Sequence, residues 1–312
     1  MLVAGLVLLV GGAELLVRSS VAIAARLGVP PLVIGLTIVA FGTSAPEAVA
    51  SIAAALRNSP GIAVGNIVGS NIANVLLVAG AAALVAPIAV SGASLRRDGV
   101  VALLGAMVLW LICALQGLNI ATGVALLLGL AAYIFYSYLM QNRHLRSAGT
   151  PAPENASGPG PRGMALLLGL IGAIAGAAVL AFGGSLLIEA AVSLAGRLGV
   201  SEVVIGLTVI AVGTSLPELA TSMLAALRGR SEIAFGNIIG SNIFNVAGIG
   251  GLTAMLSQGE VPSRLIMVDF PIMVAATGLL LFVAMTGLRI GRREGAALLS
   301  IFGLYVGVVW LA

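Results

Sequence analysis

The chain has 312 residues, of which 60% are hydrophobic and only 8% charged, with a formal net charge of +4. Several apolar runs are long enough to cross a bilayer, so the composition excludes a soluble domain and predicts an all-α polytopic membrane protein. All 15 basic residues are arginines, and most lie in predicted loops. The positive charge therefore indicates membrane orientation and gives no support for a nucleic-acid partner.

Hydropathy and helix-breaking residues predict ten membrane-spanning helices. In the first half of the chain the spans cover residues 2–25, 30–56, 62–85, 99–115 and 121–140. In the second half they cover residues 164–195, 202–227, 233–256, 266–286 and 294–311. Asp98 and Asp269 stand at the predicted starts of two spans, where we expect them to stabilise helix N-termini.

A polar segment rich in proline, glycine, serine and alanine separates the two sets of spans. It reads RSAGTPAPENASGPGPR over residues 146–162, a composition typical of a flexible tether without a core. We therefore divide the chain into a first five-helix repeat at 1–140, a linker at 141–163 and a second five-helix repeat at 164–312.

The predicted loops carry arginine very unequally. One side of the membrane receives eleven arginines: Arg26, Arg96, Arg97, Arg143, Arg146, Arg162, Arg228, Arg230, Arg289, Arg292 and Arg293. The other side receives Arg57, Arg197 and Arg264. Because short cytoplasmic loops are enriched in arginine, we expect the linker to be cytoplasmic and both termini to be extracytoplasmic, in the plasma (inner) membrane.

The two halves are copies of one unit. GLTIVAFGTSAPEAVASIAAALR from Gly35 returns as GLTVIAVGTSLPELATSMLAALR from Gly206, with most positions identical. IAVGNIVGSNIAN from Ile62 returns as IAFGNIIGSNIFN from Ile233 at the same spacing along the chain. With five spans in each copy, the second copy enters the membrane from the opposite side. This inverted topology is typical of secondary transporters and brings equivalent residues together near the midplane.

Each copy carries a proline and a carboxylate inside an apolar span. Pro46 and Pro217 cannot donate a helical hydrogen bond, so each predicts a helix break about one turn earlier that frees main-chain oxygens. The oxygen-bearing side chains beside these breaks are Thr43, Ser44 and Glu47, and Thr214, Ser215 and Glu218. Two facing carboxylates with hydroxyls and carbonyls form a hard-oxygen cage of the kind that Ca²⁺ favours, and they balance one divalent or two monovalent cations.

The second motif adds hydroxyl and amide groups on glycine-rich spans. Ser70 and Asn74 are four residues apart and share a helix face, as do Ser241 and Asn245. The glycines permit either a close approach between helices or a break in the helix. The other asparagines of the motif are expected either to bond between helices or to contact an ion; they are Asn66, Asn71, Asn237 and Asn242. The absence of cysteine and histidine nearby argues against softer metals.

GTSxPE followed by GNxxGSNIxN, present twice, resembles the α-1 and α-2 repeats of the cation/Ca²⁺ antiporter superfamily, in particular the prokaryotic sodium/calcium exchangers. The resemblance covers both motifs, at 35–80 and 206–251, and the ten-span plan. It implies a central site where Na⁺ and Ca²⁺ compete, with alternating exposure to the two membrane faces. It also implies that the first and sixth spans slide past the remaining helices.

The resemblance further implies a set of cation ligands. The side chains are Thr43, Ser44, Glu47, Ser70 and Asn74, with Thr214, Ser215, Glu218 and Ser241, and the main-chain oxygens of Ala40 and Ala211 are expected to join them. Asn245 is a further candidate at a position where some relatives carry an aspartate. The amide there removes a third acidic group and argues against potassium cotransport.

We therefore expect a secondary antiporter that exports Ca²⁺ in exchange for Na⁺. The same two glutamates leave a proton/Ca²⁺ antiporter open as the alternative, whereas a cation channel is less well supported because nothing predicts a ring of identical filters. We expect no cofactor, no nucleic acid and no obligatory protein partner, with the two ions and the lipid bilayer as the partners. The sequence contains no paired nucleophile and base and no HExxH motif, so we do not expect an enzyme.

Overall fold

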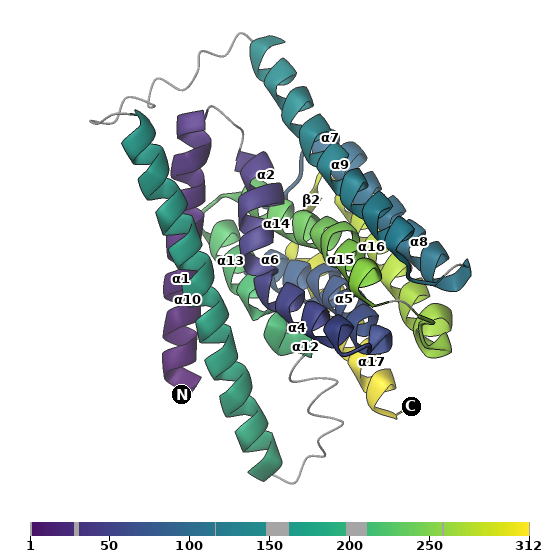
Figure 1. Ribbon diagram of the computed structural model, residues 1–312. Coiled ribbons are helices and arrows are strands. Elements are labelled where there is room, and N and C mark those ends of the chain that lie inside the picture. The colour runs from purple at the N-terminus through teal and green to yellow at the C-terminus, as the bar shows by residue number, and fades with distance from the viewer. Residues whose placement is uncertain are drawn as a thin grey trace.

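The computed structural model describes residues 2–27, 31–115, 117–147, 162–197, 211–257 and 259–311, and this part of the chain is almost entirely helical (Figure 1). In the first half the elements are α1 (Leu2–Leu27), α2 (Pro31–Ile34), the π-helical turn η1 (Gly35–Val39), α3 (Ala40–Thr43), α4 (Ala45–Leu56), α5 (Pro60–Ala73), η2 (Asn74–Val78), α6 (Ala79–Val85), β1 (Ile88–Ala89), α7 (Gly92–Ser94), η3 (Leu95–Gly99), α8 (Val100–Leu115) and α9 (Ile120–Ser147). In the second half they are α10 (Arg162–Arg197), α12 (Ala211–Thr214), α13 (Leu216–Leu227), α14 (Ser231–Ile243), η6 (Phe244–Ile249), α15 (Gly250–Leu256), η7 (Leu265–Asp269), α16 (Phe270–Met285), β2 (Arg289–Ile290) and α17 (Arg292–Leu311).

The helices match the predicted spans closely. Seven continuous helices and one bent pair in the described part of the chain are long and apolar enough to cross a membrane, and they coincide with eight predicted spans. The span predicted at 294–311 corresponds to α17. For the span predicted at 202–227, the structure describes the part from Ala211 onward, and residues 202–210 lie outside the described residues.

The helices beside the linker are longer than the spans predicted from hydropathy. α9 continues to Ser147 and α10 already begins at Arg162, so both ends of the segment assigned to the linker are helical. The apolar part of α9 nevertheless ends at Met140, where the span was expected to end. Residues 148–161 of the predicted linker lie outside the described residues.

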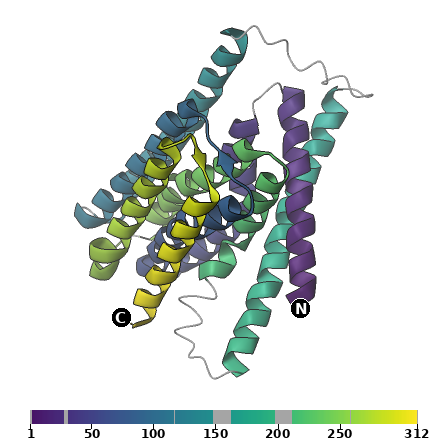
Figure 2. The same cartoon turned by 180° about the vertical axis from the view of Figure 1, so that it is seen from behind.

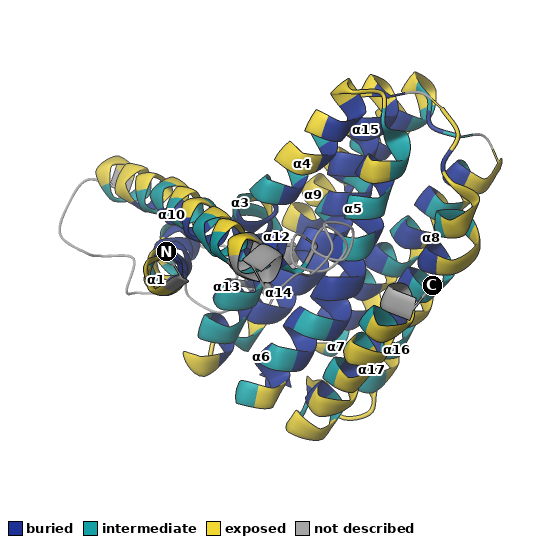
Figure 3. Cartoon of the chain, turned by 90° about the horizontal axis from the view of Figure 1, so that it is seen from below, coloured by how far each residue is buried: buried dark blue, intermediate teal, exposed yellow. Residues whose placement is uncertain are grey.

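Two continuous helices form the centre of the bundle. In the stretches Pro60–Val85 and Ser231–Leu256, 78% of the most apolar part is buried inside the protein, against 17% for α9 and 22% for α10. Viewed from below, the buried residues gather on α5, α14 and α15, whereas yellow, exposed residues face outward on the peripheral helices (Figure 3). The central helices are therefore shielded by protein, and the peripheral ones present large apolar side chains to the surroundings.

α1 and α10 lie side by side along most of their length at one edge of the bundle (Figure 1, Figure 2, Figure 3). Glycines let their backbones meet. A methyl group on Gly12 would lie 2.8 Å from the main-chain nitrogen of Leu180 and 3.0 Å from the Gly176 carbonyl oxygen, and one on Gly183 would lie 3.0 Å from the Gly5 carbonyl oxygen. Gly5 and Gly176 are repeat equivalents, as are Gly12 and Gly183, so the interface follows the internal symmetry. Small residues at such positions are the usual basis of close packing between membrane helices.

Contacts between loops repeat the same symmetry. β1 pairs antiparallel with β2, with Ile88 opposite Ile290, and Leu118 forms a bridge with Gly259 elsewhere in the structure. The spacing of the repeat carries Ile88 onto Gly259 and Asn119, next to Leu118, onto Ile290, so the two contacts are equivalent to within one residue. The predicted topology places them on opposite membrane faces, as an inverted repeat requires.

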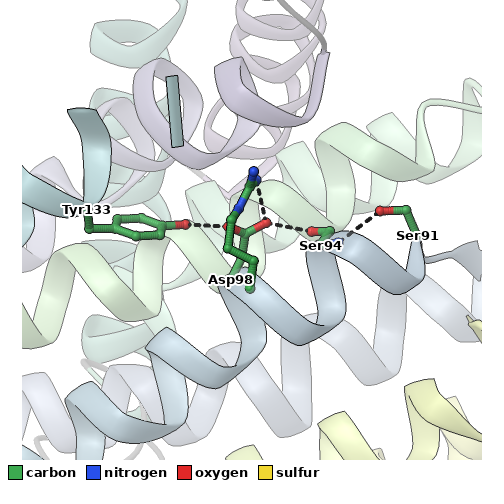
Figure 4. A network of polar contacts seen from close by, with 5 residues as sticks. Ser91, Ser94, Asp98 and Tyr133 are labelled. Carbon is green, nitrogen blue, oxygen red and sulfur yellow. Dashed lines mark hydrogen bonds and ion pairs between the residues drawn. The ribbon is translucent and has the colours of Figure 1, made fainter. Parts of the chain in front are cut away.

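Asp98 occupies a buried polar network (Figure 4). Its carboxylate accepts hydrogen bonds from the Ser94 hydroxyl at 2.7 Å and from the Tyr133 hydroxyl at 2.9 Å. Arg97 forms an ion pair with it at 2.7 Å. The prediction that Asp98 stabilises a helix N-terminus is wrong, because the helix already begins at Gly92 and the carboxylate instead joins η3 to α9.

The second half has a related contact. Asp269 accepts a hydrogen bond of 3.2 Å from the Tyr305 hydroxyl, which joins the α16 span to α17. Asp98 and Asp269 are repeat equivalents, and each aspartate binds a tyrosine on the following helix. The peripheral helices are thus fastened in pairs by equivalent polar contacts.

The glycine interface can be tested with adjacent substitutions. We expect Gly12→Ala to destabilise the protein by about 1–3 kcal/mol because its methyl group would press on the α10 backbone. Gly11→Ala is the matched control, since no described atom lies within 4 Å of a methyl group there; its better helix propensity should make it neutral or stabilising by up to about 1 kcal/mol. Thermal unfolding in detergent measures both, and equal melting temperatures for the two variants would contradict the close contact.

Candidate cation site

A helix break places each glutamate of the repeats at the start of a half-helix. α3 ends at Thr43, Ser44 has non-helical torsion angles, and α4 begins at Ala45, with a bend of 51° across the break. Pro46 accounts for the break because its ring excludes the preceding helical geometry. Glu47 then lies in the first turn of α4, where the positive end of the helix dipole favours a negative charge.

The second repeat is built in the same way. α12 ends at Thr214, Ser215 has φ −85° and ψ 6°, and α13 begins at Leu216 with Pro217 in its first turn. Glu218 occupies the first turn of α13. Both glutamates are therefore presented by the N-termini of half-helices that belong to opposite repeats.

The two carboxylates are buried and bonded across the repeats. Glu47 is 1% exposed and Glu218 is fully buried. The Ser44 hydroxyl donates to Oε1 of Glu218 at 2.9 Å, and the Ser215 hydroxyl donates to Oε1 of Glu47 at 3.3 Å. Each repeat thus supplies a hydroxyl to the carboxylate of the other, which brings the two acids into one cluster.

Asn66 and Asn237 support these half-helices in equivalent ways. The Asn237 amide donates to the main-chain oxygen of Glu218 at 3.4 Å and to the Ser222 hydroxyl at 2.9 Å. The Asn66 amide donates to the main-chain oxygen of Glu47 at 3.2 Å and to the Ser51 hydroxyl, also at 2.9 Å. For these two asparagines, the structure favours bonding between helices over the ion contact that the sequence left open.

The threonines and the Ala40 carbonyl lie beside the carboxylates. The Thr43 hydroxyl donates to Oδ1 of Asn237 at 3.1 Å and lies 3.5 Å from the Ser241 hydroxyl. The Ala40 carbonyl accepts a hydrogen bond from the Ser44 main-chain nitrogen at 3.0 Å and lies 3.3 Å from the Thr43 hydroxyl. The carbonyl of Ala40 is therefore not freed by the helix break, contrary to the sequence-based expectation.

Thr214 is buried at the equivalent place in the second repeat. Ala211 begins α12, but its side chain lies outside the described residues.

The serines and asparagines of the second motif that share a helix face are also buried. Ser70 and Ser241 lie on α5 and α14, and Asn74 and Asn245 lie in the π-helical turns η2 and η6 that follow. Asn245 donates a hydrogen bond of 3.2 Å to Oδ1 of Asn71. Turns of this kind occur often at functional sites, and the helices are not broken there.

In the second repeat, the glycines of this motif allow a close approach between helices, whereas Gly65 and Gly69 in the first repeat have no backbone neighbour at that distance. A methyl group on Gly236 would lie 2.9 Å from the carbonyl oxygen of Leu32, and one on Gly240 would lie 2.7 Å from the Cα of Leu36. α14 thus packs directly on the segment that leads into α3 and Thr43.

Several buried polar atoms of this region have no hydrogen-bond partner in the described part of the structure. They are Glu47 Oε2, Glu218 Oε2, Ser70 Oγ, Asn74 Oδ1 and Nδ2, Thr221 Oγ1, Asn242 Oδ1 and Nδ2, and Asn245 Oδ1. Buried polar groups are normally paired, and an unpaired carboxylate oxygen is especially costly. A cation is a chemically suitable partner because most of these atoms are oxygens.

We call this set of side chains the central polar cluster: the buried polar groups between Thr43 and Asn74 and between Thr214 and Asn245. The sequence singled out most of its members. It gave Ser51 and Ser222 no role, although both are retained in the repeated stretch and both bind the supporting asparagines. The signal that identifies them is therefore the repeat itself.

An inverted helical repeat with buried acidic groups at the crossing of its halves is the construction of a secondary transporter. Comparisons with known proteins identify the kind of transporter. A family model described as sodium/calcium exchanger protein matches residues 1–139 and 168–311. The chain is 39% identical over 309 residues to the putative antiporter CaxA of Alkalimonas amylolytica, covering 96% of this chain and 94% of that protein.

Two further comparisons agree. The chain is 34% identical over 340 residues to the sodium/calcium exchanger MaX1 of Methanosarcina acetivorans, covering 99% of this chain and 97% of that one. Its structure resembles that of the sodium-calcium exchanger NCX_Mj solved with Na⁺ and without Ca²⁺, at a TM-score of 0.83 and 30% identity over 98% of this chain and 96% of the other. The chain belongs to the sodium/calcium exchanger family. It has the ten-helix inverted repeat of that fold and is a cation antiporter, not an enzyme.

Because Asn237 supports the half-helix that begins near Glu218, we expect truncation of its side chain to lower the stability of the protein. We expect Asn237→Ala to cost about 1–3 kcal/mol because Ser222, Thr43 and the Glu218 carbonyl would lose a buried partner. Asn242→Ala is the matched control on the same helix, since no hydrogen bond of the Asn242 side chain is present in the described structure. Chemical denaturation in detergent compares the two, and an equal loss for both would contradict the supporting role.

Proposed function

We propose that this protein exchanges Ca²⁺ for Na⁺ across the membrane and that both ions bind in turn at the central polar cluster. The observation that carries the proposal is the pair of buried glutamates from opposite repeats. Each accepts a serine hydrogen bond at one carboxylate oxygen and keeps its second oxygen buried, without a partner among the described residues. Such oxygens are available to a cation.

The chemistry of the cluster supports these two ions. Its groups are carboxylate, hydroxyl, amide and carbonyl oxygens, which suit hard cations, and Ca²⁺ takes about 6–8 oxygen ligands. Two negative charges are balanced by one Ca²⁺ or by two Na⁺. A cluster of this charge cannot hold both loads at once, so competition between the ions follows from charge balance.

The proposed ligands are the residues assigned from the sequence. They are Glu47, Glu218, Thr43 and Thr214 as the principal groups, with Ser44, Ser215, Ser70, Ser241, Asn74 and Asn245 and the main-chain oxygens of Ala40 and Ala211. The Ala40 carbonyl would contribute through its remaining acceptor capacity. The unpaired oxygens of Ser70, Asn74 and Asn245 in the described structure support their inclusion.

The coupling of the two ion fluxes follows from the free-energy cost of a cluster without a bound cation. Two unpaired carboxylates shielded from water are unfavourable, so a conformational switch without a bound cation would be suppressed. A ligand shifts the equilibrium between two exposed states only through its different affinity for them. The protein would therefore switch between its two exposed states only when a cation occupies the cluster, which links the Ca²⁺ flux to the Na⁺ flux.

The names of relatives support Na⁺ as the counter-ion. MaX1 is named a sodium/calcium exchanger, and NCX_Mj has been solved with Na⁺, Ca²⁺ and Sr²⁺. We further propose that the protein lies in the plasma (inner) membrane with the 141–163 linker in the cytoplasm and both termini outside. The two repeats at 1–140 and 164–312 would act as the two structural halves of the transporter, without a cofactor or an obligatory protein partner.

Transport in vesicles distinguishes the counter-ions. Purified protein in sealed liposomes should accumulate Ca²⁺ when Na⁺ is loaded inside and diluted outside at equal pH. Uptake driven only by a pH difference would identify a proton/Ca²⁺ antiporter and overturn the assignment of Na⁺. Passive Ca²⁺ flux without any counter-ion would identify a channel.

We expect removal of either glutamate's charge to have opposite effects on transport and on stability. Glu218→Gln and Glu47→Gln should each abolish exchange, while in cation-free buffer with a chelator each variant should melt at a temperature equal to or above that of the wild type. The reason is that each variant removes one unpaired buried charge. Added Ca²⁺ should raise the melting temperature of the wild type by mass action but not that of the variants. Glu232→Gln, on the exposed start of α14, is the control and should keep both responses. Full exchange by either cluster variant would defeat the ligand assignment.

A further inference from the structure

The two helices at the edge of the bundle, α1 and α10, carry charged side chains within their apolar sequences. α1 carries Glu14 and Arg18, and α10 carries Glu189. Ionisable residues within membrane helices are costly and usually functional. The central polar cluster does not use any of the three.

Glu14 joins α1 to the bundle. Its carboxylate forms an ion pair with Arg228 at 2.9 Å and a second ion pair with Arg18 one helical turn along α1. Arg228 follows the last residue of α13, so the first pair fastens α1 to the end of a half-helix that begins near Glu218. The side chain of Glu14 is 23% exposed and that of Arg228 is 55% exposed.

The repeat places a second arginine at the corresponding position. The spacing of the repeat carries Arg57 onto Arg228, and each arginine caps the C-terminus of its half-helix. The next residue has a positive φ in both turns, 53° at Asn58 and 68° at Gly229. In the predicted topology the two arginines therefore sit in equivalent turns on opposite sides of the membrane.

A second acid lies near the position equivalent to Glu14. Ser185 is the repeat equivalent of Glu14, and Glu189 follows it by four residues on α10. Four residues are about one turn, or roughly 6 Å along the axis, and they share a helix face. Glu189 stands at the position equivalent to Arg18, and the long arginine side chain spans the offset from Ser185. Arg57 and Glu189 therefore offer a pair of opposite charges one helical turn from the site equivalent to Arg228 and Glu14.

The second pair is not formed in this structure. Among the residues described, neither Arg57 nor Glu189 takes part in an ion pair, and both side chains are exposed. The packing differs in the same sense, because α1 packs closely along α13 whereas α10 makes far fewer contacts with the equivalent α4. α1 is thus joined to the half-helix α13, whereas α10 has no matching ion pair with the equivalent half-helix α4 among the described residues.

We propose that Glu14–Arg228 and Arg57–Glu189 are alternative ion-pair latches, each closing the α1–α10 pair against one side of the bundle in one end state. The proposal rests on the proposed function in that it requires alternating access. In an inverted repeat, the second state follows when the two halves exchange their conformations. α10 then packs along α4 as α1 packs along α13 here, and Arg57 meets Glu189 while Arg228 leaves Glu14.

Cross-linking tests both latches in one background. In the Cys113→Ser protein, Glu14→Cys/Arg228→Cys and Arg57→Cys/Glu189→Cys should each form a disulfide on mild oxidation, and each disulfide should stop exchange until it is reduced. Arg57→Cys/Leu187→Cys is the matched control and should not cross-link, because Leu187 faces Gly5 on the α1 side of α10. Failure of the Arg57/Glu189 pair to cross-link faster than this control would overturn the proposal.

Charge removal provides a second test that does not depend on transport. Each latch favours its own state by about two- to fivefold if it resembles other partly exposed ion pairs. Glu189→Gln should therefore speed cross-linking of the Glu14→Cys/Arg228→Cys pair by up to that factor, and Glu14→Gln should do the same for Arg57→Cys/Glu189→Cys. Glu232→Gln should change neither rate. Equal rates in all three backgrounds would show that the charges do not bias the states and would overturn the latch.

The two proposals fail in different ways. If both disulfides form but liposomes show no Na⁺-driven Ca²⁺ uptake, the assignment of ions is wrong and the latch stands. If Na⁺-driven uptake is normal and the Arg57/Glu189 pair does not cross-link, the latch is wrong and the exchange stands.

Discussion

The structure depends on one constraint: two carboxylates lie in the apolar interior of a membrane protein. Such groups require polar partners, and Glu47 and Glu218 obtain them from the opposite repeat through Ser215 and Ser44. That requirement explains why each glutamate begins a half-helix and why an asparagine fixes the main chain beside it. It also explains why the most deeply buried helices are the ones that carry the supporting amides and hydroxyls.

The α1–α10 pair answers a different requirement. A helix pair at the edge of a bundle has two interfaces, one within the pair and one toward the bundle. The glycine contacts supply the first, because backbone meets backbone at Gly12 and Gly176. The outer contacts are unequal, close between α1 and α13 and sparse between α10 and α4. The duplicated sequence therefore does not impose identical packing on its two halves.

Much of the architecture was predictable from the sequence because hydrophobicity and the repeat act over whole helices. The spans and the grouping of Glu47, Ser44, Glu218 and Ser215 followed from these signals. Local geometry did not. The Ala40 carbonyl keeps its helical hydrogen bond, since the chain turns at Ser44, two residues beyond the predicted break.

Two other features escaped the sequence because they depend on contacts between helices. The start of the helix that contains Asp98 lies seven residues upstream of the predicted span, and its partner Tyr133 comes from another helix. The π-helical turns at Asn74 and Asn245 have no signal in hydropathy, which averages over several residues.

Because each repeat supplies a hydrogen bond to the glutamate of the other, neither half of this protein is a self-sufficient unit. Ser215 is synthesised 168 residues after Glu47, so a nascent chain carries an unsatisfied acid into the bilayer until its distant counterpart arrives. The polar centre therefore cannot be completed before the second repeat has been synthesised.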